Sequence, residues 1–174
     1  MEMGKTAVPE ILLTLVQQLN YEAREKSAVL QVEESSSKIA KLQGFLSGVS
    51  SYKSAMFESG YAIDERFLGT QECKLPYLQA GEFTGDLSEL REIVSDVDDL
   101  TESAAYTVLE NELQYRVEEK KNELFYSSDK GRDLYFVKGW YDAMSWVGKT
   151  IGKLRAILEA MEEEKKETLP FDVE

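Results

Sequence analysis

The sequence predicts a mainly α protein, and three observations support this fold class. Apolar residues recur every three or four positions over long tracts. The three prolines, Pro9, Pro76 and Pro170, lie near the start, the middle and the end of the 174 residues, which leaves the tracts between them free of helix breakers. One segment of different character separates these tracts. We therefore expect a long antiparallel helical hairpin within a three- or four-helix bundle, with one irregular or short-hairpin insertion at about residues 60–85.

A single helical domain accounts for the whole length, because 43% of the residues are hydrophobic and one core of ordinary size is sufficient. Residues 1–58 predict N-terminal helices, with Pro9 at an early helical position and Ser59-Gly60 as the stop. Residues 59–85 form the irregular segment, residues 86–166 the hairpin and residues 167–174 a tail.

The hairpin is the firmest part of this prediction. Asp86 is placed as an N-cap, with Glu89 three residues later, and apolar residues then follow at helical spacing to about Tyr126. The run SSDKGRD, from Ser127 to Asp133, is typical of a turn between helices. A turn this short places the two arms side by side in antiparallel orientation.

The last helix combines a regular apolar seam with glycines that a helix disfavours. The seam contains Val137, Trp140, Met144, Val147, Ile151, Leu154, Leu158 and Met161. Each interior glycine costs about 1 kcal/mol relative to alanine. Gly148 and Gly152, like Gly44 and Gly48 in the first tract, are spaced four apart, which clears a strip where another backbone can approach closely.

Trp146 lies off this seam, near the opposite face of the helix. Two interpretations follow. Either the fold wraps the helix from two sides, or the second surface meets another chain with Trp146 as an anchor. Trp140, both glycine pairs and Trp146 are therefore candidate interaction residues. Phe171 in the tail is a further candidate, because Leu-Pro-Phe could dock in a partner's pocket or fold back on its own helices.

The charge distribution restricts the partners. The net charge is −13, and residues 59–114 carry 13 acidic and 3 basic side chains, a net charge of −10. This middle third repels phosphate backbones and anionic membranes, so we expect neither direct nucleic-acid binding nor membrane binding. No stretch approaches the roughly 20 apolar residues of a membrane span. With a single cysteine and no signal sequence, we expect a cytoplasmic protein.

The chain lacks the residues of most enzymes. It contains no histidine, which removes the commonest general base and metal ligand, and one cysteine cannot build a thiolate zinc site. Phosphate-binding glycine motifs are absent as well. Glu89 and Glu92 resemble half of the acidic motif of all-helical nucleotide pyrophosphohydrolases, but no Glu-x-x-Asp supplies the other half. We therefore expect no enzyme activity, metal or cofactor.

Residues 112–158 resemble a style that is common in small proteins of tailed phages. In those proteins an acidic helical hairpin carries an aromatic-x-x-Gly element early in its second helix, followed by a Leu-Arg-Ala-Ile/Val-Leu run. Phe136-Val137-Lys138-Gly139 and the run from Leu154 to Leu158 carry the likeness here. The resemblance implies a phage or prophage setting, in the host cytoplasm or the virion, and it transfers no functional residue.

Two functions remain. The first is a non-enzymatic interaction or assembly protein, a phage particle component or accessory factor, that uses its helical faces to contact protein partners or copies of itself in a homo-oligomer. The second is an acidic inhibitor that mimics nucleic acid and occupies the basic groove of a host defence or DNA-binding protein. Asp96, Asp98 and Asp99 are the residues expected to carry that mimicry.

Overall fold

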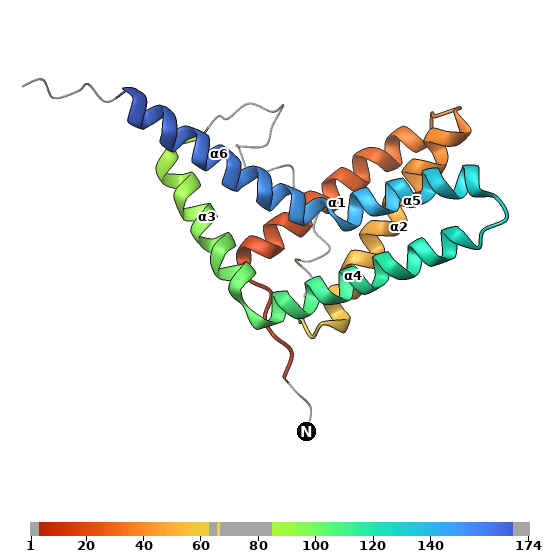
Figure 1. The fold of residues 1–174 in the computed structure, drawn as a ribbon, viewed down its shortest axis with the longest axis horizontal. Helices are drawn as coiled ribbons and strands as arrows, with labels where there is room; N and C mark the ends of the chain where they lie inside the picture. The colour runs from red at the N-terminus through yellow and green to blue at the C-terminus, as the bar shows by residue number, and fades with distance from the viewer. Residues whose placement is uncertain (1–3, 63–65, 67–84, 169–174) are drawn as a thin grey trace, which may run out of the picture.

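The computed structural model describes residues 4–62, 66 and 85–168, and these residues contain six α-helices (Figure 1). The mainly α class is confirmed. The helices are α1 (Glu10–Leu30), α2 (Ser36–Glu58), α3 (Leu87–Glu102), α4 (Ala104–Phe125), α5 (Lys130–Met144) and α6 (Trp146–Thr168). Most of the predicted irregular segment lies outside the described residues.

Helices α1 and α2 lie within the predicted N-terminal tract, and Pro9 stands directly before the first residue of α1 rather than inside the helix. Pro9 precedes α1 with an extended backbone, and its carbonyl accepts the first helical hydrogen bond from Leu13. Helix α2 ends at Glu58, and two residues later Gly60 has a φ of 93°, a left-handed conformation that glycine adopts without strain. The backbone of Thr6 then pairs with Gly60 and Ala62, which holds the approach to α1 against the end of α2.

The first arm of the predicted hairpin is bent at Ser103 rather than continuous. Ser103 has an extended backbone with ψ of 143°, so the helix ends at Glu102 and restarts at Ala104. The Ser103 hydroxyl forms hydrogen bonds at the end of α3 and at the start of α4. It donates to the carbonyl of Leu100 at 2.6 Å and accepts from the amide of Tyr106 at 3.3 Å. A serine that caps a new helix satisfies backbone groups that the bend would leave unpaired.

The second arm is interrupted more gently at Ser145. Its backbone amide still donates to Tyr141, and its carbonyl still accepts from Lys149, so α5 and α6 follow one another with a short irregularity between them. The Ser145 hydroxyl donates to the same Tyr141 carbonyl at 2.7 Å, a side-chain bond that often bends helices. The six helices thus form four arms, of which the last two are bent.

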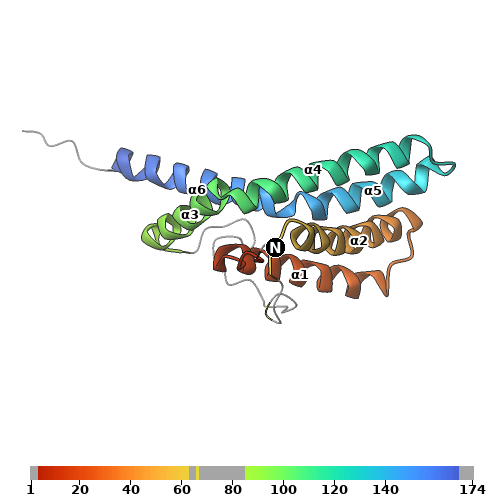
Figure 2. The same cartoon turned by 90° about the horizontal axis from the view of Figure 1, so that it is seen from below.

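The two bent arms divide the molecule into two parts. At one end α4 and α5 form the hairpin and lie over α1 and α2 as a second layer (Figure 2). At the other end α3 and α6 diverge from the hairpin and close a triangular outline (Figure 1). Two ion pairs join α3 to α6, Arg91 with Glu162 at 3.0 Å and Arg155 with Asp98 at 2.8 Å.

One hydrophobic core runs through both parts. Its buried side chains come from every helix, and they include Leu12, Val16 and Leu19 of α1, Tyr52 and Met56 of α2, Leu90 and Val97 of α3, Leu109 of α4, Trp140 of α5, and Val147 and Leu154 of α6. Burying a side chain of this size contributes about 1.5–3 kcal/mol. The bent arms therefore share one hydrophobic core with α1 and α2.

Candidate functional site

The first glycine strip lies at a close crossing of two helices. Gly44 and Gly48 of α2 are buried against α5, where Gly139 faces them. A Cβ on Gly44 would overlap the carbonyl of Phe136, and a Cβ on Gly139 would overlap the carbonyl of Lys41. The strip permits close backbone approach as predicted, but the approaching backbone belongs to the same chain. Gly44 and Gly48 are therefore covered within the monomer.

Trp140 is also taken up by the core. Its side chain is only 4% exposed, and it packs where α5 meets α2 and α4. The ammonium group of Lys120 in α4 lies 5.4 Å from its ring centroid, a cation–π arrangement. The indole therefore stabilises the interior and offers no surface to a partner.

Trp146 occupies a different position, on the wall of a cleft. Four elements line this Trp146 cleft, namely α1, α2, the end of α5 and the first two turns of α6, and its volume is about 460 Å³. Trp146 is half-buried and packs against the edge of the core. The sequence therefore located an aromatic residue on a second face, and the fold surrounds that face with four elements of its own chain.

The second glycine strip is open. Gly148 and Gly152 have no atom within 4 Å of the place where a Cβ would stand. Ala156 and Ala160 continue the same four-residue spacing along α6 and are exposed as well. Small residues therefore follow one another along the outer side of this helix. The glycine spacing predicted the two glycine positions of this strip. The two alanines were not predicted, although they continue the same four-residue spacing in the sequence.

The acidic candidates lie on the outer side of α3. Asp96, Asp98 and Asp99 are all exposed, while Val94, Val97 and Leu100 of the same helix are buried. Asp98 is engaged by the guanidinium of Arg155, so it is part of the α3–α6 contact. Phe171, the tail candidate, lies outside the described residues.

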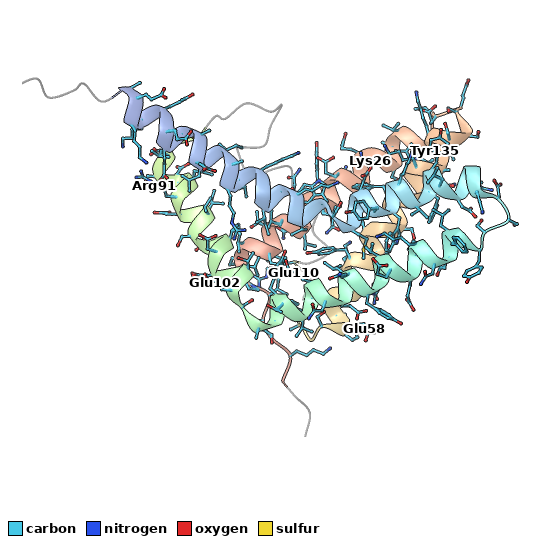
Figure 3. The ribbon with its side chains drawn as sticks, viewed as in Figure 1. Lys26, Glu58, Arg91, Glu102, Glu110 and Tyr135 are labelled. Atoms are coloured by element: carbon cyan, nitrogen blue, oxygen red, sulfur yellow. The ribbon has the colours of Figure 1, made fainter. Side chains whose placement is uncertain are left out.

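The end of the α4–α5 hairpin carries an aromatic surface that was not predicted from the sequence. Phe125 is 72% exposed and Tyr126 is 83% exposed, and their rings meet edge to face with centroids 5.2 Å apart. Leu134 and Tyr135 at the start of α5 are also exposed, and so is Val32. Val32 belongs to the connection between α1 and α2, which lies at the same end of the molecule as the α4–α5 turn (Figure 1). Tyr135 is labelled at this end in Figure 3. These five residues are called the tip surface below. Phe-Tyr directly before a polar turn was the signal available in the sequence.

A hollow adjoins the tip surface. It lies between the first turns of α2 and α5, has a volume of about 490 Å³ and is lined in part by Ile39, Ala40 and Tyr135. Arg132 and Asp129 supply charged groups at its edge. The exposed aromatic pair and a partly apolar hollow therefore occur at the same end of the molecule.

Three buried tyrosines lie beneath the bend at Ser103. Tyr52, Tyr61 and Tyr106 are each no more than 3% exposed. Burial raises the pKa of Tyr52 and of Tyr61, and it raises the pKa of Tyr106 with a further contribution from the nearby Glu110 carboxylate (Figure 3). All three remain neutral at physiological pH. This cluster carries hydroxyls into the core.

The described residues present no grouping of three or more histidine, cysteine or acidic side chains that could hold a metal ion. Nor does any of their helices have the length and apolar character to cross a membrane. Comparison of the chain with protein-family models, with curated proteins and with solved structures finds no match. The arrangement of surfaces is therefore the basis for inferring a function.

Proposed function

We propose that this protein is a non-enzymatic assembly protein that associates with a second copy of itself through the tip surface. The observation that carries the proposal is the exposure of two adjacent aromatic side chains, Phe125 and Tyr126, at the end of a helical hairpin. Large aromatic residues are enriched at protein interfaces and depleted where a monomer meets only water. A surface of this kind is typical of an interaction protein.

The hollow beside the tip suggests how two copies fit together. In a two-fold symmetric dimer each copy offers the same surface, so a protrusion on one copy meets the feature next to it on the other. The rings of Phe125 and Tyr126 in one copy would fill the hollow between α2 and α5 of the second copy. The same two rings of the second copy would fill the hollow of the first. Aromatic anchors that enter pockets are the residues that carry most binding energy at interfaces.

The open strip on α6 provides a further helical surface for assembly beyond a dimer. Gly148, Gly152 and Ala156 leave a path along which another helix could approach closely. Self-association with a second contact surface is what a particle component or an accessory factor of a phage would need. That setting is the one implied by the resemblance of residues 112–158, and it belongs to the same proposal.

Sedimentation velocity tests the proposal directly. Between about 1 and about 100 µM the wild-type chain is expected to shift from monomer to dimer, because the observed species follows the dissociation constant. The double variant F125S/Y126S is expected to remain monomeric over this range. Tyr115→Ser is the matched control, since Tyr115 is 59% exposed on α4 but lies away from the tip. A monomeric wild type, or a dimer that both variants retain, contradicts the proposal.

A second candidate function is the acidic mimic of nucleic acid, favoured by the ordered position of its carboxylates. Asp96 and Asp99 project from the exposed side of a well-formed helix, where their spacing is fixed. A D96K/D99K variant should lose salt-sensitive binding to a DNA-binding protein. E163K/E164K, on exposed positions near the end of α6, makes the same change of net charge and serves as the control. Asp98 is left unchanged, because replacing it would also break its ion pair with Arg155.

A further inference from the structure

The Trp146 cleft is a basic site in an acidic protein. Five lysines line it, and they come from three helices: Lys26 of α1, Lys38 and Lys41 of α2, and Lys149 and Lys153 of α6. Three carboxylates accompany them, from Glu22, Glu33 and Asp142, so the lining has a formal charge of +2. The chain as a whole carries −13. A local reversal of sign inside a cleft favours an anionic occupant.

All three carboxylates are already engaged by the protein. Glu22 accepts a hydrogen bond from the side-chain amide of Gln18 at 3.5 Å. Glu33 accepts hydrogen bonds from the backbone amides of Glu34 and Ser35 at 3.1 and 3.0 Å. Asp142 pairs with Lys41 at 3.7 Å. Within the described part of the chain, neither Lys38 nor Lys153 forms an ion pair, so their positive charge is available to a ligand.

The walls between these lysines are apolar and aromatic. Val29, Leu42, Phe45 and Trp146 face the cleft. The ammonium group of Lys26 lies 4.8 Å from the centroid of the Phe45 ring, so one lysine is held against the aromatic wall. A ligand that fits must therefore combine an apolar body with a negative group.

The size of the cleft points to a small molecule. Small-molecule sites in proteins typically measure about 300–1,000 Å³ and combine apolar walls with a few charged groups. The volume of about 460 Å³ falls within this range. Four elements enclose the cleft, which distinguishes it from the open side of α6 where another helix could lie.

We propose that the Trp146 cleft binds a small organic anion, in which an aromatic or aliphatic body packs on Trp146 and Phe45 and a carboxylate or phosphate group meets the lysines. This site is separate from the tip surface, and it holds whether or not the chain dimerises. The positions of Trp146 and of the lysines on three separate helices mean that only the folded chain forms it.

The fluorescent anion 8-anilinonaphthalene-1-sulfonate is a suitable probe, because it joins an aromatic body to one negative charge. Titration of the full chain should give saturable fluorescence at a stoichiometry near one, and the affinity should fall as salt is raised. The variant K38E/K153E should weaken binding by about tenfold or more, since it reverses two exposed charges at the rim. K165E/K166E at the far end of α6 makes the same change of net charge and should leave binding unchanged.

Two further measurements identify the chemistry and keep the test decisive. Displacement of the probe by phenyl phosphate assigns the site to phosphate ligands, and displacement by decanoate assigns it to carboxylates. The uncharged analogue N-phenyl-1-naphthylamine should bind at least about tenfold more weakly than the anionic probe, and this comparison uses only the wild-type chain. Any one of three results overturns the proposal. The first is equal affinity for the anionic and the uncharged probe, and the second is an equal loss of affinity in K38E/K153E and K165E/K166E. The third is that neither phenyl phosphate nor decanoate displaces the probe.

Discussion

Gly44 of α2 lies directly against the backbone carbonyl of Phe136 in α5, and the two helices approach so closely that a methyl group on this glycine would overlap the carbonyl. The same crossing places Gly139 against the carbonyl of Lys41. Two helices of one chain therefore pack backbone to backbone at this point. The crossing holds the hairpin layer on the N-terminal layer, and it fixes where the Trp146 cleft lies between them.

Replacing Gly44 or Gly139 by alanine should destabilise the protein, although alanine is the better helix former. The added methyl forces α2 and α5 apart, and overpacking of this kind costs about 1–3 kcal/mol. This cost exceeds the gain of about 1 kcal/mol in helix propensity. Urea unfolding followed by circular dichroism measures the difference. Equal or greater stability of G44A and G139A would show that the helices are not packed this closely.

The exposed glycines of α6 supply the opposite expectation. At Gly148 and Gly152 there is open space, so alanine should raise the free energy of unfolding by about 0.5–1 kcal/mol at each position. The same urea titration measures it, and these variants serve as matched controls for the buried glycines. Loss of stability in G148A or G152A would indicate that this strip is packed against something in the isolated chain.

Ser103 is expected to be the residue that stabilises the bend between α3 and α4. Replacing it by alanine removes the hydroxyl that accepts from the amide of Tyr106, and losing such a cap costs about 1 kcal/mol. Ser95→Ala, on the exposed side of α3, should change stability by less than about 0.5 kcal/mol. Thermal unfolding of both variants checks this expectation. If S103A matches the wild type, the bend is held by side-chain packing alone.

The buried tyrosines predict a loss of stability at alkaline pH. Because burial raises the pKa of Tyr52, Tyr61 and Tyr106 in the folded state, the stability that depends on their neutral form is fully present below the ordinary tyrosine pKa of about 10. It is lost as the pH rises beyond that value, since the unfolded chain releases its protons first. Urea unfolding between about pH 8 and about pH 11 measures this decline.

Tyr52→Phe isolates one contribution to that decline. Its hydroxyl has no hydrogen-bond partner among the described residues, so its removal should change stability at neutral pH by less than about 1 kcal/mol. The alkaline loss of stability should become smaller. Tyr126→Phe, on the exposed tip surface, should retain the full loss and serves as the control. A Y52F variant with an unchanged alkaline profile would contradict the assignment.

The sequence by itself determined the mainly α class and several helix ends, because the spacing of apolar residues and the capping residues act over a few positions. It did not indicate the breaks at Ser103 and Ser145. Pro9, Gly60 and Asp86 mark helix ends that the structure confirms. The helical spacing of the apolar residues also indicated which face of α3 is buried. Asp96 and Asp99 lie on the other face and are exposed. Local rules suffice here, since a helix end or a helix face depends only on residues within about one turn.

The tertiary structure alone decided what each helical surface meets. Gly44 and Gly148 stand in the same four-residue glycine pattern, yet one is packed against α5 and the other faces open space. The lysines of the Trp146 cleft are separated along the chain by more than a hundred residues, from Lys26 to Lys153, and no local pattern joins them. Contacts between distant segments depend on where arms bend and cross, so the bends at Ser103 and Ser145 determined which surfaces remain available.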